Sequence, residues 1–130
     1  MTSTEDQPVD RHAAMRTALI TAARAGTASA AVPATLMTLE PRITRDGRFL
    51  DYCDPEAATV EWPEMIENGG WSSTQLLLLK AAAFLAGARG IEINLNRAME
   101  RLDERQADIL DQMLVAHHTG KLDENLVTLP

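Results

Sequence analysis

The sequence predicts an α+β fold that is predominantly helical, with a three-helix C-terminal core, a β-hairpin and a peripheral N-terminal helix. Three observations lead to this prediction. A helix-capping signal after Trp71 precedes a long apolar run, apolar residues recur at helical spacing from Leu95, and an Asp46-Gly47 pair separates two stretches with strand character.

The chain length favours one domain. At 130 residues, the chain has a typical domain size and should bury roughly two thirds of the surface it exposes when unfolded. Its 45% hydrophobic and 24% charged residues are ordinary for a globular protein. Residues 1–9 are polar and include Pro8, so we expect a disordered tail there and a single domain over residues 10–130.

A first helix is predicted over residues 10–26. Asp10 is a suitable N-cap, and Gly26 would end the helix. Met15 and Leu19 belong to a thin apolar stripe along it. The small residues that follow read as a connector.

A β-hairpin is predicted over residues 35–52. Asp46-Gly47 favours a type I′ turn, which needs positive φ at both central residues. Pro41 argues that the first strand lies at a sheet edge or carries a bulge. Because two strands alone are marginal, Leu126 to Leu129 is a candidate third strand.

The second strand of this hairpin is a candidate interaction surface, formed by Phe49, Arg48 and Tyr52. In the predicted register, Phe49 faces away from Ile43 and Leu50, so both sets cannot pack on the same helical layer. An exposed strand with little charge or proline protection can pair with another chain. The alternative, in which another element covers Phe49, stays open.

A helical core is predicted over residues 71–119. Ser72 and Gln75 have the spacing of a capping box. The helix that follows is apolar nearly all round, which is typical of a central helix, and we expect Leu78 and Phe84 to be buried.

Two shorter apolar patterns complete this core. Asp103 and Gln106 form a second capping pattern between two helices. The first of these helices should bury Leu95, Ala98, Met99 and Leu102, and the second Ile109, Leu110, Met113, Leu114 and His117.

The run GGWSSTQLLLLKAAAFLAG, followed by LNRAMERLDERQADILDQML, resembles a stretch found in uncharacterised proteins of actinobacterial type. The similar region covers roughly residues 66–118. The resemblance implies a GGWSS-capped apolar helix followed by two short helices, and it implies no activity.

The charge distribution argues against a nucleic-acid partner. The chain has 12 basic and 19 acidic residues, giving a net charge of −7, and no cluster of Lys and Arg. If the C-terminal helices formed a helix-turn-helix, the recognition helix would present Asp103, Glu104, Asp108 and Asp111 against Arg105. That is the wrong sign for a DNA groove.

The sequence predicts no catalytic, cofactor-binding or metal-binding residue. His117 and His118 are adjacent, so on a helix they point about 100° apart and cannot chelate one ion. Cys53 lies among carboxylates that should raise the pKa of its thiol, which favours a structural role. Phosphate-binding loops, dinucleotide-binding glycine patterns and nucleophile elbows are absent from the sequence.

A cytoplasmic location is expected. The acidic, polar start lacks the basic and apolar segments of a signal peptide. The longest apolar stretch, Leu76 to Ala88, has 13 residues and contains Lys80, so no membrane span is predicted.

These observations favour a small, non-catalytic accessory or regulatory protein that acts through protein–protein contacts, with a protein partner or a homo-oligomer as its binding mode. A DNA-associated transcriptional regulator that uses the C-terminal helices is the main alternative. A small enzyme comes third, and a deep pocket holding His12, His117 or Cys53 would favour it.

Overall fold

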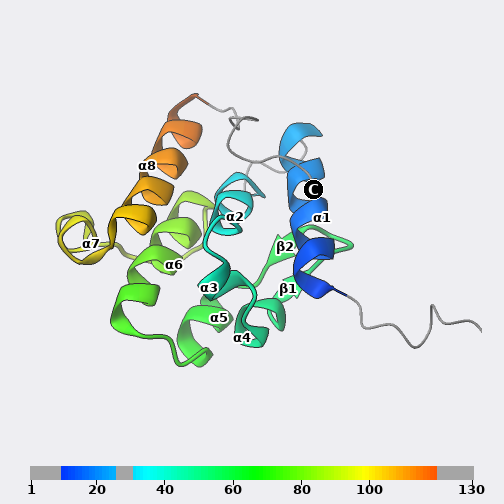
Figure 1. The fold of residues 1–130 in the computed structure, drawn as a ribbon, viewed down its shortest axis with the longest axis horizontal. Helices are drawn as coiled ribbons and strands as arrows, with labels where there is room; N and C mark the ends of the chain where they lie inside the picture. Colours follow the sequence, from blue (N-terminus) through cyan, green and yellow to red (C-terminus); the bar gives the residue numbers. More distant parts are fainter. Residues whose placement is uncertain (1–9, 26–30, 120–130) are drawn as a thin grey trace, which may run out of the picture.

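The computed structural model describes residues 10–25 and 31–119 of the chain (Figure 1). In chain order, the elements are α1 (Arg11–Ala25), α2 (Ala31–Met37), α3 (Pro41–Thr44), α4 (Gly47–Leu50), β1 (Cys53–Asp54), β2 (Thr59–Val60), α5 (Trp62–Asn68), α6 (Ser73–Leu85), α7 (Leu95–Arg101) and α8 (Glu104–Thr119). The predicted fold class, α+β and predominantly helical, is confirmed.

Three helices, α2, α6 and α8, pack against one another at the centre of the molecule. Leu36, Leu78 and Leu110, one from each helix, are at most 1% exposed. Helix α1 lies on the outer side of α2, and α7 lies at the edge beside α6 and α8 (Figure 1). The predicted C-terminal trio is therefore corrected: α2 is the third central helix, and α7 is peripheral.

Helix α2 forms where a connector was predicted, across Pro33. A proline in the first turn of a helix removes an N–H that has no intrahelical partner, so the helix tolerates it. The Thr35 hydroxyl donates to the Ala31 carbonyl at 2.7 Å, so this buried polar group is satisfied within the helix. The small side chains allow close packing on both sides, and six of the seven residues of α2 are buried.

The predicted hairpin over residues 35–52 is wrong, because the turn signals there start helices. Asp46 has φ −69° and ψ 135°, and its carboxylate caps α4 by accepting from the Arg48 backbone N–H. Glu40 caps α3 in the same way, with Pro41 in the first turn. An Asp-Gly pair can begin a helix as well as a tight turn, and here it begins one.

The short hairpin of the fold lies further along the chain. Strands β1 and β2 pair antiparallel, with Cys53 opposite Val60 and Asp54 opposite Thr59. Ala58, just before β2, has a positive φ of 54°. The predicted tail over residues 1–9 and the candidate strand Leu126 to Leu129 lie outside the described residues.

The local capping signals are confirmed. The Ser72 hydroxyl accepts from the Gln75 N–H at 3.2 Å, and the Gln75 side chain accepts from the Ser72 N–H at 3.0 Å. Asp103 and Gln106 make the same reciprocal pair at the start of α8, at 2.7 and 3.3 Å. Asp10 caps α1 by accepting from the Ala13 N–H at 3.0 Å.

The predicted burial is wrong at four positions. Phe84 is 50% exposed, Leu95 is 44% exposed and Met99 is 47% exposed, while His117 lies on the surface. The reason is that Phe84, Leu95 and Met99 lie on the outer sides of α6 and α7, and that Ala116 occupies the inward position near the end of α8.

A buried carboxylate links α3 to α8. The Glu40 side chain is fully buried and accepts from the Arg42 guanidinium at 2.9 and 2.6 Å. Arg42 also donates to Asp103, the N-cap residue of α8, at 3.0 Å. Burial raises the pKa of Glu40, but the hydrogen bonds and charge of Arg42 outweigh it and lower that pKa below its ordinary value.

Over the described ranges, no helix combines the length and the apolar character that crossing a membrane requires.

Candidate functional site

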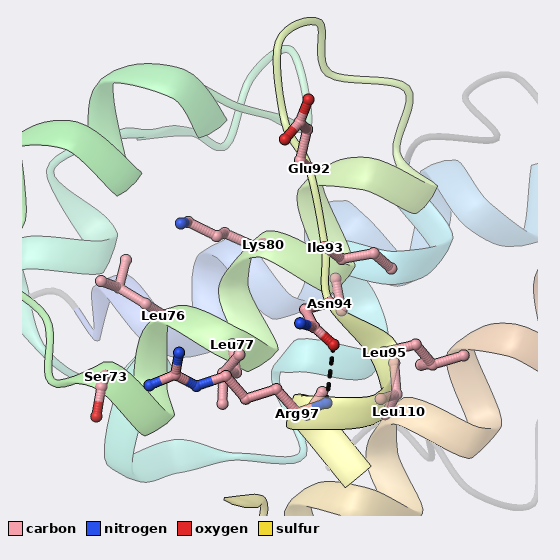
Figure 2. Close-up of a pocket in the computed structure, with 12 residues that line it drawn as sticks. Ser73, Leu76, Leu77, Lys80, Glu92, Ile93, Asn94, Leu95, Arg97 and Leu110 are labelled. Atoms are coloured by element: carbon pink, nitrogen blue, oxygen red, sulfur yellow. Dashed lines mark hydrogen bonds between the residues drawn. The ribbon is translucent and has the colours of Figure 1, made fainter.

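A groove of about 770 Å³ lies between α6, α7 and the segment that joins them (Figure 2). The chain reverses direction after α6 because Gly87 and Gly90 adopt positive φ values of 87° and 75°. The Ala88 N–H donates to the Ala83 carbonyl at 3.0 Å and closes the end of α6. Residues 91–94 then run back beside α6 and form one wall of the groove.

The floor of the groove is apolar. Leu76, Leu77 and Ala81 come from α6, while Ile93 and Leu95 come from the opposite wall. Leu76 and Leu77 are only half-buried, although they lie within the most apolar run of the chain. They are partly exposed because, among the residues that the structure describes, no helix covers this side of α6.

Two cationic side chains flank this floor. Figure 2 shows Lys80 and Arg97 extending to the same side, with Leu76 and Leu77 between them. The Asn94 side-chain oxygen Oδ1 accepts from the Arg97 backbone N–H at 3.0 Å, which fixes the start of α7. Within residues 10–25 and 31–119, neither the Lys80 ammonium nor the Arg97 guanidinium forms an ion pair.

Exposed apolar side chains also lie beyond the groove. Phe84 lies one turn after Lys80 on the same stripe of α6, and Met99 lies one turn after Leu95 on α7. Phe84 and Met99 are thus exposed apolar side chains one turn beyond residues that line the groove. Exposed apolar side chains grouped in this way are typical of an interaction site.

The predicted interaction surface of Phe49, Arg48 and Tyr52 is not formed as a strand edge. Phe49 is 1% exposed and makes an edge-on contact with the Trp62 ring, with centroids 6.4 Å apart. Tyr52 is half-buried, and its carbonyl accepts from the Glu61 N–H at 2.8 Å. The alternative in which Phe49 is covered is the one that the structure supports.

Arg48 has a structural role, because its guanidinium contacts several other parts of the fold. Its guanidinium pairs with Asp46 at 2.8 Å, donates to the carbonyls of Gly69 and Gly70 at 3.0 Å, and lies 4.5 Å from the centre of the Trp71 ring. It therefore holds the end of α5 and the start of α6 against α4. A side chain with so many intramolecular contacts has little left for a partner.

The residues considered for catalysis are not brought together. His12 is buried and lines a pocket with arginines, whereas His117 and His118 are exposed at the end of α8. Burial raises the pKa of the Cys53 thiol to about 12, and the thiol donates to the Phe49 carbonyl at 3.2 Å. The cause of this shift is burial, rather than the neighbouring carboxylates invoked from the sequence.

No group of three or more His, Cys, Asp or Glu side chains in the described part of the chain is arranged to hold a metal ion. The acidic side chains on the first turns of α8 are exposed to solvent, among them Glu104, Asp108 and Asp111. They line a shallow hollow together with Asp103 and Arg105.

Sequence reasoning missed the groove because it assigned the whole apolar pattern of α6 and α7 to the core. One signal was present in the sequence. Lys80 interrupts the apolar run, and residues spaced by three, four or seven positions from it share its face. That spacing places Leu77 and Phe84 beside a charge that has to remain solvated.

Comparisons with known proteins find no counterpart for this chain. No family model matches the sequence. No curated protein and no solved structure matches it either.

Proposed function

We propose that this protein is a non-catalytic accessory or regulatory protein, and that it binds another protein through the groove between α6 and α7. The occupant we infer is an amphipathic helix of the partner, with apolar side chains on one face and carboxylates beside them. The observation that carries the proposal is the apolar floor flanked by Lys80 and Arg97.

The apolar part of the groove supports a helical occupant. Helices dock in grooves through apolar anchors spaced by three, four and seven residues, which bury their apolar face. The groove of this chain lies between two helices, its lining includes the exposed Leu95, and the exposed Met99 follows one turn later on α7. Covering these side chains would remove apolar surface from water, at roughly 25 cal/mol per Å².

The charges that line the groove support the inference that the partner helix is acidic. Lys80 and Arg97 are available at the groove, whereas the chain as a whole carries a net charge of −7. Glu92 is the one carboxylate that lines the groove, so its lining has a small positive excess. Carboxylates on the partner would find complementary charges here and repulsion over much of the remaining surface.

A second copy of this chain is a less suitable occupant. In a two-fold dimer, two grooves with the same positive excess would face each other, so the exposed acidic face of α8 would have to enter the α6–α7 groove of the next copy instead. Such a head-to-tail contact uses two different surfaces, and it continues into a ring or a filament. A different protein can bind in the groove without forming a ring or a filament.

The test is site-specific photo-crosslinking in the cell that produces the chain. A photoreactive amino acid replaces Met99, one turn after the groove residue Leu95 on α7, and a matched control replaces Val115, which is 57% exposed on α8. We expect a protein adduct from position 99 that the control site does not give. The variant Lys80→Glu should remove the adduct, because it places a carboxylate opposite the partner's own.

The crosslinked segment, identified by mass spectrometry, should contain an apolar helical stripe with neighbouring Asp or Glu residues. Equal adducts from positions 99 and 115, an adduct that survives Lys80→Glu, or no protein adduct would contradict the proposal. An adduct to a second copy of the chain would replace it with self-association. An adduct to nucleic acid would favour the transcriptional regulator instead.

A further inference from the structure

A second pocket gathers positive charge on another part of the molecule. It has a volume of about 430 Å³ and lies between the start of α1, the α2–α3 junction, the end of α3 and the start of α8. Arg16, Arg45 and Arg105 line it together with His12 and one carboxylate, Asp10. Three guanidinium groups from three helical regions thus converge in a chain whose net charge is −7.

Two of these arginines are held in place by hydrogen bonds to the α2–α3 junction. Arg105 donates from Nη2 to the Leu39 carbonyl at 2.8 Å, and Arg16 donates from Nε to the Thr38 hydroxyl at 3.3 Å. A guanidinium carries five N–H donors, so Arg105 uses one and keeps others for a ligand. The anchoring reduces the conformational entropy that ligand binding would cost.

Arg45 adds a third positive charge to the lining of this pocket. It follows α3 as the C-cap residue, and its side chain is exposed. In the described parts of the chain, its guanidinium forms no salt bridge. Asp10 caps α1 and also lines the pocket, where its negative charge offsets one of the three guanidinium charges.

His12 faces this positive environment as a buried, neutral imidazole. Its Nε2 lies 3.0 Å from the Thr44 hydroxyl oxygen, which donates its own proton to the Glu40 carbonyl at 3.2 Å. The hydroxyl must therefore accept from His12, which places the proton of the neutral ring on Nε2. Burial lowers the pKa of His12, Arg45 and Arg16 lower it further, and Asp10 opposes them.

We propose that this pocket is a binding site for a dianionic oxyanion, namely a phosphoryl group carried by a small molecule. Three guanidinium groups and one carboxylate leave two net positive charges in the lining, which match a phosphate dianion at neutral pH. Guanidinium groups recognise phosphate oxygens by paired, charge-assisted hydrogen bonds. The pocket is also larger than a bare phosphate ion needs, so it has room for the rest of such a molecule.

An anion in this pocket would gain favourable charge interactions. Arg45 and Arg105 are exposed and can reach a ligand from solvent, and guanidinium groups that line one pocket attract an opposite charge placed between them. A bound dianion would also favour the protonated form of His12. The pocket and the α6–α7 groove have no lining residue in common, so this proposal is independent of the partner-binding proposal.

The test uses inorganic phosphate as the probe, by isothermal titration calorimetry at constant ionic strength on the full chain. We expect saturable binding that Arg45→Gln weakens at least about tenfold, because that substitution removes a charge without breaking a hydrogen bond of the fold. Arg105→Gln should weaken binding as well. Arg89→Gln, an exposed arginine outside the pocket, is the matched control and should bind phosphate like the wild type.

A second readout follows the His12 ring by NMR. Phosphate should raise the pKa of His12, and Arg45→Gln should reduce this increase. Sulfate should compete with phosphate, and acetate should bind more weakly because it carries one charge. The proposal is overturned if no saturable binding occurs, if Arg89→Gln weakens binding as much as Arg45→Gln, if acetate binds as tightly as phosphate, or if the His12 pKa does not respond.

Discussion

Truncating one side chain on each face of α6 should distinguish its buried face from its exposed face by the loss of stability. Leu78 is 0% exposed and faces the other central helices, whereas Phe84 is 50% exposed on the stripe beside the groove. Both residues lie in the same helix and in the same apolar run. Their substitution by alanine therefore tests tertiary burial with little difference in local sequence.

For Leu78→Ala, we expect a loss of about 3–5 kcal/mol in the free energy of unfolding. A fully buried leucine loses the transfer free energy of its side chain, and the surrounding helices close the cavity only in part. The Phe84 side chain is only about half buried, so Phe84→Ala loses about half of the free energy that complete burial would contribute. Complete burial of an aromatic side chain contributes about 1.5–3 kcal/mol, so the loss for a half-buried one is roughly 0.8–1.5 kcal/mol. The higher helix propensity of alanine offsets part of it.

The assay is urea denaturation followed by circular dichroism at neutral pH. With a slope of about 1–3 kcal/mol per M urea, Leu78→Ala should lower the midpoint by on the order of 2 M and Phe84→Ala by well under 1 M. Equal slopes for the two variants would show that both unfold in the same transition. Comparable midpoint shifts would refute the assigned orientation of α6, and with it the exposed stripe beside the groove.

Three other substitutions or reactions test the remaining structure. Glu40→Gln should cost about 1–3 kcal/mol at pH 7. Because Arg42 lowers the folded-state pKa of Glu40, this cost should shrink as pH falls below about 4.5, which urea titrations at several pH values can measure. Cys53 should react slowly with a disulfide reagent at pH 8 and rapidly in urea, since burial raises its pKa to about 12. Phe49→Asp should cost more than the roughly 3–5 kcal/mol of an alanine truncation, and an unchanged melting temperature would contradict its burial.

The capping signals were predicted correctly because their physics is local. Ser72 with Gln75, and Asp103 with Gln106, satisfy backbone N–H groups within one turn of their own helices. No distant part of the chain is needed for these bonds. The starts of α6 and α8 could therefore be predicted from sequence.

The hairpin prediction was wrong because an Asp-Gly pair is compatible with both a tight turn and a helix start. Contacts with distant parts of the chain determine which of the two forms. Asp46 caps a helical turn that buries Phe49 against Trp62, so the ring becomes part of the core. In a hairpin with the expected register, Phe49 would lie on the face opposite Leu50. The helical turn lets both side chains be buried, and apolar burial is the larger contribution to free energy.

The two candidate sites differ in how much of each was visible in the sequence. Lys80 inside the apolar run indicated that one side of α6 stays solvated, and the groove lies on that side. Nothing in the spacing of Arg16, Arg45 and Arg105 indicated that they share a pocket, because they are far apart along the chain.

The sequence by itself determined which segments become the C-terminal helices, where the caps of α6 and α8 lie and that the chain is predominantly helical, since helical periodicity and capping act over a few residues. Only the tertiary structure decided that α2 rather than α7 completes the central trio, that Glu40 is buried with Arg42, and that three distant arginines converge. The physical reason is that packing and electrostatics depend on which surfaces meet, and neighbours along the chain do not specify that.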